Sequence, residues 1–166
     1  SARITTPANL TIGAYHDIND KWSVMAEFGR TYWSSFDTLD IYGENNGKMS
    51  TTEERWKDTT FYAIGASYQY NDQWKFRVGF AVDQSAVGQE YRTPRIPDSD
   101  RLWYSSGIEY KYNDDWTFNL GYTYIRADKG KVKLLGYHDG DNARGSLQAD
   151  YENDIHILGF GASYNF

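Results

Sequence analysis

Tyr70–Asp83 reads Tyr-Asn-Asp-Gln-Trp-Lys-Phe-Arg-Val-Gly-Phe-Ala-Val-Asp, and this stretch decides the fold class. After the Asn-Asp turn, large apolar residues alternate with charged or small ones. Because successive side chains of a strand point to opposite faces, the pattern predicts a strand with one apolar face and one polar face. Helical spacing does not fit it.

The same turn occurs at two other places in the chain. Ile18-Asn19-Asp20-Lys21-Trp22 and Tyr112-Asn113-Asp114-Asp115-Trp116 are close copies of residues 70–74. Each copy lies between two alternating segments, which is typical of a short hairpin. The predicted strands are 8–18, 22–42 with a bend or break near Ser34-Ser35, 57–70, 74–86, 101–112, 116–130 and 150–166. Whether 131–137 extends the sixth strand stays open.

The two faces of these strands favour a membrane barrel over a soluble β-sandwich. The apolar face begins at each turn with two aromatic residues, Tyr70 with Trp74 and Tyr112 with Trp116, and the last strand ends on Phe166, as expected for an interfacial girdle. Ten strand residues at about 3.3 Å each, tilted by about 45°, cover roughly 23 Å, close to the apolar band of such barrels. Unpaired charges in a sandwich core would each cost several kcal/mol. Here the polar face carries Glu27, Lys75, Arg77, Asp83, Glu109 and Lys111.

The predicted connections alternate in length. Three short Asn-Asp turns lie on one side, and the longer segments 43–56, 87–100 and 131–149 lie on the other. Outer-membrane barrels have short periplasmic turns and long external loops. We therefore expect an all-β, antiparallel, up-and-down transmembrane β-barrel in the bacterial outer membrane, with seven strands in this chain.

Composition excludes several other classes of protein. Aromatic residues make up 17% of the chain although its mean hydropathy is −0.75, an unusual combination for a soluble domain. The net charge of −6 offers no basic surface to phosphates, so no nucleic-acid partner is expected. Without cysteine, neither a disulfide nor a thiolate metal site can form. No run of about 18 apolar residues predicts a membrane-spanning helix.

An odd number of strands has consequences for closure. It predicts that the two termini lie on opposite sides of the membrane. Because single-chain bacterial barrels have even strand numbers, we expect the chain to be incomplete at its N-terminus. An open sheet would expose two unpaired edges to lipid. An N-terminal half, a second copy of the chain, or an eighth strand from 131–149 could close it.

Several segments resemble the C-terminal half of the FadL-like transporters of the outer membrane. They cover nearly the whole chain in order: Trp33-Ser34-Ser35-Phe36, Trp56-Lys57-Asp58, Ile64-Gly65-Ala66-Ser67-Tyr68, Trp74-Lys75-Phe76-Arg77-Val78-Gly79, Ile96-Pro97-Asp98-Ser99-Asp100-Arg101 and Gly161-Ala162-Ser163-Tyr164-Asn165-Phe166. The Pro-Asp-x-Asp-Arg element is the most specific of them. The ending Tyr164-Asn165-Phe166 also resembles the aromatic C-terminal signal of outer-membrane proteins.

The resemblance implies a fourteen-stranded barrel plugged by an N-terminal hatch. Such a barrel takes long-chain fatty acids or other hydrophobic molecules from outside and releases them sideways into the membrane. On this interpretation residues 1–166 are the C-terminal portion of a single barrel domain, without the hatch.

Three cations are candidates for binding a ligand carboxylate. Arg101 lies at the mouth of a strand, and a guanidinium binds carboxylates in bidentate fashion. The alternative is an ion pair with an aspartate of residues 98–100. Lys75 and Arg77, one pleat apart on the polar face, could likewise bind an anionic head group or pair with Glu109 across the sheet.

Four aromatic residues fall on the polar face or near the external rim, where they could line an apolar ligand site or pack under the loops. These are Trp33, Phe36, Phe61 and Trp103. His16 and His156 fall on the lipid face and His138 in a loop, so no catalytic or metal-binding group of histidines is expected. Residues 139–142 (Asp-Gly-Asp-Asn) lack the spacing of a calcium loop.

The sequence therefore predicts passive transport of hydrophobic molecules, chiefly long-chain fatty acids, with membrane lipid as the surrounding partner and without a cofactor. The alternative is a structural or adhesion-type barrel whose external loops contact other surfaces. An outer-membrane enzyme is not expected, because no nucleophile and base can be paired.

Overall fold

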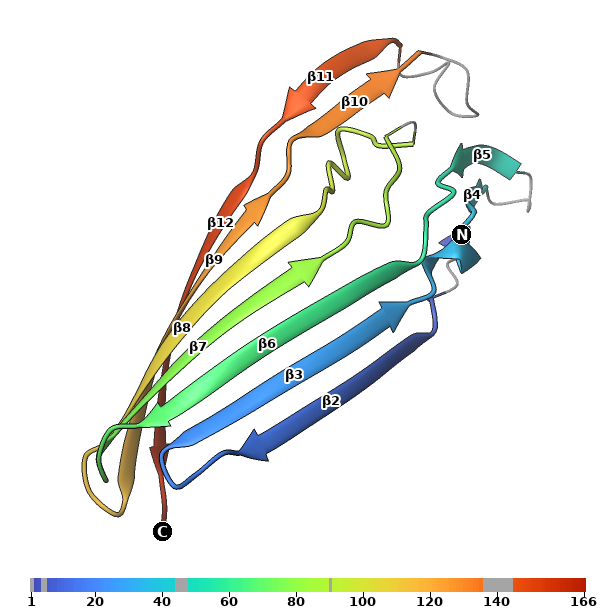
Figure 1. Ribbon diagram of the computed structural model, residues 1–166. Helices are drawn as coiled ribbons and strands as arrows, with labels where there is room; N and C mark the ends of the chain where they lie inside the picture. Colours follow the sequence, from blue (N-terminus) through green and yellow to red (C-terminus); the bar gives the residue numbers. More distant parts are fainter. Residues whose placement is uncertain (1, 4–5, 44–47, 90, 136–144) are drawn as a thin grey trace.

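The computed structural model describes residues 2–3, 6–43, 48–89, 91–135 and 145–166. Its centre is one antiparallel sheet of seven strands in the order β12-β9-β8-β7-β6-β3-β2. Each strand pairs with the sheet strand that comes next along the chain, so the sheet is an up-and-down meander (Figure 1). The strands are β2 (Asn9–Asp17), β3 (Trp22–Thr31), β6 (Thr59–Gln69), β7 (Trp74–Asp83), β8 (Arg101–Lys111), β9 (Trp116–Ala127) and β12 (Asp154–Tyr164).

Shorter elements lie at the end of the sheet opposite the turns, which we call the loop end. There β4 (Thr38–Tyr42) pairs with both β1 (Ala2–Arg3) and β5 (Lys48–Glu53), next to a 3₁₀ turn, η1 (Trp33–Ser35). A second ribbon, β10 (Gly130–Leu134) with β11 (Leu147–Tyr151), continues β9 and β12 outward (Figure 1). The described part of the chain contains no helix with the length and hydropathy of a membrane span.

The three Asn-Asp turns have one structure. In each, the Asn side-chain oxygen accepts hydrogen bonds from two backbone N–H groups; for Asn71 these are the groups of Gln73 (3.0 Å) and Trp74 (2.9 Å). Asn19 and Asn113 accept the equivalent bonds. An asparagine side chain that satisfies its own turn explains why this residue recurs there.

Each tryptophan after a turn packs on a tyrosine directly across the sheet. The ring centroids lie 4.6 Å apart for Trp22 and Tyr68, 4.5 Å for Trp74 and Tyr110, and 5.0 Å for Trp116 and Tyr164. Trp74 and Tyr70 also flank their turn, where the Tyr70 N–H donates to the Trp74 carbonyl at 2.9 Å, and Tyr112 donates to Trp116 in the same way at 3.0 Å. The tyrosine of each packed pair lies on the next strand of the sheet, which is connected to the strand of the tryptophan by a long loop and not by the Asn-Asp turn.

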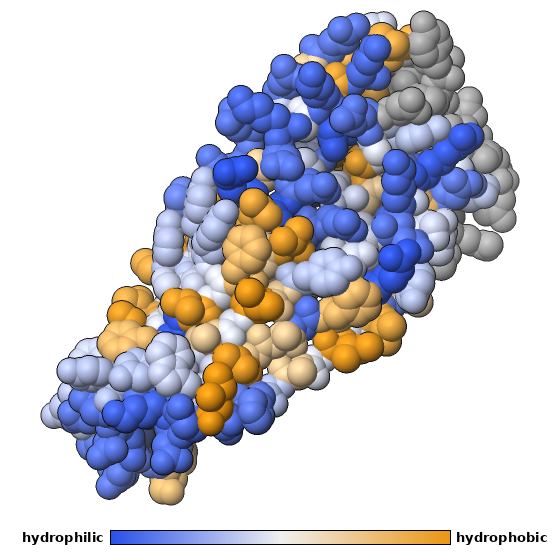
Figure 2. Space-filling model, viewed as in Figure 1, coloured by the Kyte–Doolittle hydropathy of each residue, from blue (hydrophilic) through white to orange (hydrophobic). Residues whose placement is uncertain are grey.

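The two faces of the sheet differ as the alternation predicts. On β7, Trp74, Phe76, Val78 and Phe80 are all at least 36% exposed, and we call their side the outer face. The intervening side chains on the inner face are more covered, and Ala81 is only 6% exposed. In the part of the chain that the structure describes, no other sheet shares strands with this one. Figure 2 shows apolar side chains across the middle of the visible face, between hydrophilic ends.

The strand boundaries confirm most of the prediction and correct parts of it. The predicted strand 22–42 breaks at η1, and β4 leaves the seven-stranded sheet. Residues 130–134 do not extend β9 within that sheet, and they pair with residues 147–151 instead. The described residues of 131–149 therefore provide no eighth strand. The two chain ends lie at opposite ends of the sheet, as expected (Figure 1).

The loop end contains the best-buried part of the molecule. Buried apolar residues come from the segment after β7 and from β10: Ala86, Val87, Val132 and Leu134. The Arg92 side chain, 6% exposed, joins these segments by donating to the carbonyls of Asp98 (2.7 Å), Lys131 (3.0 Å) and Val87 (3.5 Å). The Lys57 N–H donates to the Ala86 carbonyl at 2.9 Å, which ties in the first external loop. We call this unit the loop cap.

Candidate functional site

A row of glycines crosses the inner face. Arg77 on β7 is in register with Gly107 on β8, Gly121 on β9 and Gly159 on β12. Glycine within a strand costs about 0.5–1 kcal/mol relative to alanine. Backbone geometry does not require it at Gly121 or Gly159, because neither has a positive φ and an added Cβ would meet no atom within 4 Å. The missing side chains leave space on this face.

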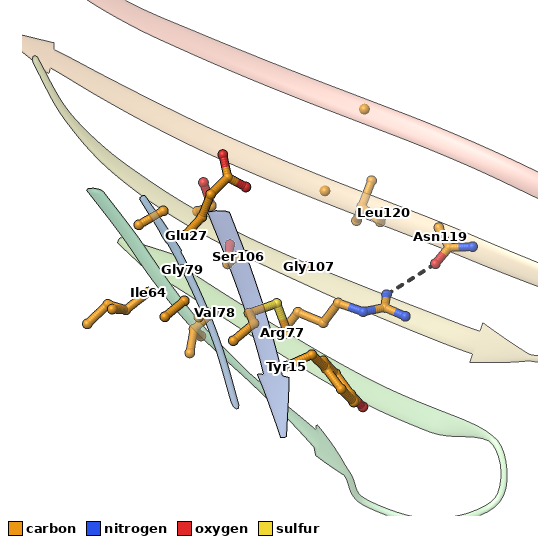
Figure 3. Close-up of a pocket in the computed structure, with 18 of the residues that line it drawn as sticks. Tyr15, Glu27, Ile64, Arg77, Val78, Gly79, Ser106, Gly107, Asn119 and Leu120 are labelled. Carbon is orange, nitrogen blue, oxygen red and sulfur yellow. Dashed lines mark hydrogen bonds between the residues drawn. The ribbon is translucent and has the colours of Figure 1, made fainter. Parts of the chain in front are cut away.

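A hollow of about 820 Å³ lies along this part of the inner face. Its lining includes Met25, Glu27, Gly65, Gly79, Asn119 and Gly159. Figure 3 shows Arg77 extended away from its strand toward Asn119, whose side-chain oxygen accepts a hydrogen bond from the guanidinium at 3.4 Å. Arg77 also forms an ion pair with Glu109 on β8. The lining of the hollow is therefore mostly small or apolar, with two charged residues, Arg77 and Glu27.

Lys75 lies one pleat nearer the turns on the same face. It is in register with Glu109, but in the described ranges no carboxylate lies within ion-pair distance of its amine. Lys75 lines a smaller polar hollow of about 420 Å³ with Asp17 and Ser23. There the Asp17 carboxylate accepts hydrogen bonds from the Tyr15 and Ser23 hydroxyls, both at 2.6 Å. Of the three predicted cations, Lys75 is thus the one whose charge is least compensated.

On the loop side of the glycine row, the inner face becomes apolar. Trp103 lies between Ala81 and Ile125 in the cross-strand register, and Ile125 is only 3% exposed. Phe61 lies across from Gly29, where an added Cβ would touch the phenylalanine at 3.4 Å. Phe61 and Trp103 therefore both lie on the inner face, between the glycine row and the loop cap.

Arg101 is held by carboxylates of the protein itself. Its guanidinium contacts Asp83 at 2.9 Å and Asp98 at 3.0 Å. Of the two predicted alternatives, the structure shows the ion pair. Asp83 was not foreseen as a partner, because a long loop separates it from Arg101 in the sequence. Asp100 instead accepts a hydrogen bond from the Ser85 N–H at 2.8 Å.

Trp33 and Phe36 lie at the rim of the loop end. Both rings stand edge-on to Trp56, with centroids 4.9 Å away in each case. Asp58 supports this cluster by accepting a hydrogen bond from the Ser34 N–H at 3.0 Å. The Ser34 hydroxyl and N–H lower the pKa of the Asp58 carboxyl below its ordinary value. Trp56, the centre of the cluster, was not among the aromatic residues predicted for the site.

The two histidines that the structure describes lie away from the inner face. By register, His16 and His156 lie on the outer face, as predicted, with His156 bonded to the Tyr122 hydroxyl at 2.7 Å. His138 and residues 139–142 lie outside the described residues. Among the residues that are described, no group of His, Cys, Asp and Glu could hold a metal ion.

Known proteins resemble the chain over its whole length. Residues 1–166 match the family described as outer membrane protein transport protein (OMPP1/FadL/TodX). The long-chain fatty acid transport protein of Escherichia coli O6:H1 is 29% identical over 100% of this chain and 35% of its own length. Outer membrane protein P1 of Haemophilus influenzae (strain Rd) is 31% identical over 98% of this chain and 36% of its own.

Solved structures show the same architecture. The crystal structure of a Pseudomonas aeruginosa FadL homologue superposes with a TM-score of 0.89 at 28% identity, over 98% of this chain and 36% of that one. A mutant of the TodX monoaromatic hydrocarbon channel gives a TM-score of 0.68 at 26% identity, over 96% of this chain and 36% of the channel. The sheet is therefore part of an outer-membrane barrel, and the chain spans about a third of these relatives.

Proposed function

Because this chain belongs to the outer membrane protein transport protein family (OMPP1/FadL/TodX), we propose that it forms part of the wall of a passive channel for hydrophobic molecules, chiefly long-chain fatty acids. Such a channel uses no cofactor and no catalytic residue. An N-terminal half closes the sheet, in the fourteen-stranded barrel that the resemblance implies, and residues 1–166 are the C-terminal portion of that single domain.

The observation that carries this proposal is the hollow kept open by Gly121 and Gly159. Backbone geometry requires glycine at neither position, although glycine lowers the stability of a strand. We explain both glycines by the space that their missing side chains leave on the inner face. Ligand sites are concave, mostly apolar and equipped with a few placed polar groups, and this hollow has that composition. An interior filled by side chains, which a merely structural barrel would have, needs no such row.

We assign the ligand carboxylate to Arg77 in this hollow and to Lys75, one pleat nearer the turns, rather than to Arg101. Arg101 already contacts two carboxylates, and a third would have to displace one of them. Arg77 has one carboxylate partner, and Lys75 has none in the described chain. The acyl chain then extends from Arg77 along the strands of the inner face, toward Phe61 and Trp103 on the loop side of the glycine row. Trp33 and Phe36 form an apolar contact at the external rim.

The test is fatty-acid binding to the full-length transporter in detergent, followed by intrinsic tryptophan fluorescence. We expect Lys75→Ala combined with Arg77→Ala to weaken oleate binding by about tenfold or more, the scale of lost charge-assisted hydrogen bonds. Methyl oleate lacks the carboxylate, so its binding should not change. Lys111→Ala is the matched control, because Lys111 is inner-facing but pairs with Asp114 at the turn (2.9 Å).

The hollow itself is tested by filling it. Gly121→Leu places a side chain where a Cβ meets no other atom, so the fold should tolerate it. Oleate and methyl oleate should then both bind more weakly. If Gly121→Leu binds both ligands as the wild type does, the site lies elsewhere. If Gly121→Leu weakens both ligands but Lys75→Ala with Arg77→Ala leaves oleate binding unchanged, only the carboxylate assignment is wrong.

A further inference from the structure

Glu109 lies beside two cations on the inner face. Lys75 is directly across from it on β7, and Arg77 is its diagonal neighbour on the same strand, two residues nearer the loop end. Side chains that are directly or diagonally opposite on paired strands lie within reach of each other. The structure shows the ion pair with Arg77, and among the described residues Lys75 has no carboxylate partner. One carboxylate is therefore available to two cations.

The Arg77–Glu109 ion pair lies at the edge of the large hollow. Arg77 is among the residues that line this hollow, and Lys75 lines the smaller hollow nearer the turns. The side chain of Arg77 is 41% exposed and that of Glu109 is 27% exposed, and an ion pair with such access to water adds little stability. The Arg77 guanidinium also donates to Asn119 at 3.4 Å. Asn119 therefore keeps the guanidinium in place while its carboxylate partner changes.

We propose that Glu109 is an internal counter-ion that is exchanged for the ligand: a fatty-acid carboxylate takes its place on Arg77, and Glu109 moves across the strand pair to Lys75. This inference rests on the proposed function, and it gives Lys75 a definite part in carboxylate binding, which is to receive Glu109. Before exchange, one carboxylate serves two cations. After it, two carboxylates serve two cations, so the bound state leaves neither Lys75 nor Arg77 without a partner.

The exchange makes Glu109 a specificity-determining residue. While a neutral ligand occupies the hollow, Glu109 stays on Arg77, so no bare cation faces the apolar molecule, an arrangement that would be costly. When the ligand is an anion, one charge-assisted contact replaces another. The same hollow therefore accepts both neutral and anionic hydrophobic molecules. Because the contact is exchanged and not added, the anionic ligand is not held tightly and leaves again, as passive transport requires.

The experiment compares oleate with methyl oleate on the full-length transporter in detergent, by intrinsic tryptophan fluorescence. Glu109→Gln frees Arg77, so oleate should bind about tenfold more tightly, the scale of one charge-assisted contact. Methyl oleate should bind more weakly, because it then meets a bare guanidinium. A merely structural role of Glu109 would weaken both ligands alike, and that result would overturn the proposal. Glu109→Asp keeps the charge and should stay closer to the wild type with both ligands.

Glu27→Gln is the matched control. Glu27 also lines the hollow, but it lies on β3 in the cross-strand row of Ala81, four residues along β7 from Arg77. In the described ranges no cation lies within ion-pair distance of its carboxylate. The substitution removes the same charge without freeing a guanidinium, so it should change either affinity by no more than about twofold. A tightening of oleate equal to that of Glu109→Gln would reduce the effect to general charge and overturn the exchange.

Lys75 provides a second test. Lys75→Gln should weaken oleate binding in the wild type, because the displaced Glu109 then has no cation to receive it. In the Glu109→Gln background the same change should have no effect. An equal loss in both backgrounds would show direct contact between Lys75 and the ligand, and the exchange would be wrong.

Arg77→Ala separates this inference from the proposed function. If Arg77→Ala weakens oleate binding but Glu109→Gln does not tighten it, the exchange is overturned and the proposed channel site stands. If Arg77→Ala leaves oleate binding unchanged, the carboxylate site itself is wrong and the exchange falls with it. The heat-modifiable gel mobility of a folded barrel is checked for every variant.

Discussion

The turn end and the loop end of this sheet are built on different principles. At the turn end, three copies of one device recur: an asparagine that bonds its own turn, and a tryptophan that packs on a tyrosine across the sheet. At the loop end, three dissimilar connections are joined by single long-range contacts such as those of Arg92. The turn end should therefore tolerate the loss of one copy, whereas the loop end depends on particular residues.

The turn end is also linked in two alternating ways. The asparagine turns join β2 to β3, β6 to β7 and β8 to β9. The Trp–Tyr pairs join β3 to β6, β7 to β8 and β9 to β12, the neighbours that are connected only through the distant loops. All six strand contacts are thus secured at the turn end, so this end holds its register even where the loops differ.

The largest expected effect is that of Arg92→Ala. It removes a buried cation from three carbonyl acceptors and should destabilise the loop cap by on the order of 3 kcal/mol. Hydrogen exchange of residues 86–99, together with limited proteolysis, measures the opening. Exchange at the turn end should not change. If residues 86–99 stayed protected, the loop cap would not depend on a single residue, and the contrast between the two ends would fail.

Next come the three tryptophans. Trp22→Ala, Trp74→Ala and Trp116→Ala should each lower the free energy of unfolding by about 2 kcal/mol, from lost ring contact and lost apolar area. Urea unfolding from lipid vesicles measures this loss. Because the three sites are copies, we expect similar values. A strongly unequal series would show that the repeat in sequence is not a repeat in energy.

The asparagines should have a smaller effect. Asn71→Ala removes the acceptor of two backbone N–H groups, but the turn is exposed and water replaces it, so we expect a loss of about 0.5–1 kcal/mol. Asn19→Ala and Asn113→Ala should match it in the same unfolding assay. Asn71→Asp keeps an acceptor oxygen and serves as the control, which should lie close to the wild type.

The smallest effect is a pH dependence at the rim. The pKa of the Asp58 carboxyl is lowered by the Ser34 hydroxyl and N–H. The stabilisation of the folded protein by the charged Asp58 carboxylate is fully present above the ordinary aspartate pKa of about 3.9. It is lost as the pH falls through the lower pKa that Asp58 has in the folded protein. Asp58→Asn should flatten this part of the acid response of Trp33 and Trp56 fluorescence. An identical acid response in this variant would contradict the assignment.

Sequence alone was sufficient for the elements and for the outer face. Strict alternation from Trp74 to Asp83 predicted the strand and its lipid side, because the direction of a side chain in a strand depends only on its position along the chain. The repeated Asn-Asp turns predicted the hairpins for the same local reason. The break near Ser34-Ser35 was also visible in the sequence.

Which residues meet across the sheet was decided by the tertiary structure. Asp83 contacts Arg101, and Tyr110 rather than Tyr70 packs on Trp74, because strand register is fixed across loops too long to specify it locally. Register likewise aligned Gly107, Gly121 and Gly159 into one row beside Arg77. The sequence by itself determined which side of each strand faces lipid, and the register alone decided that the other side contains a hollow.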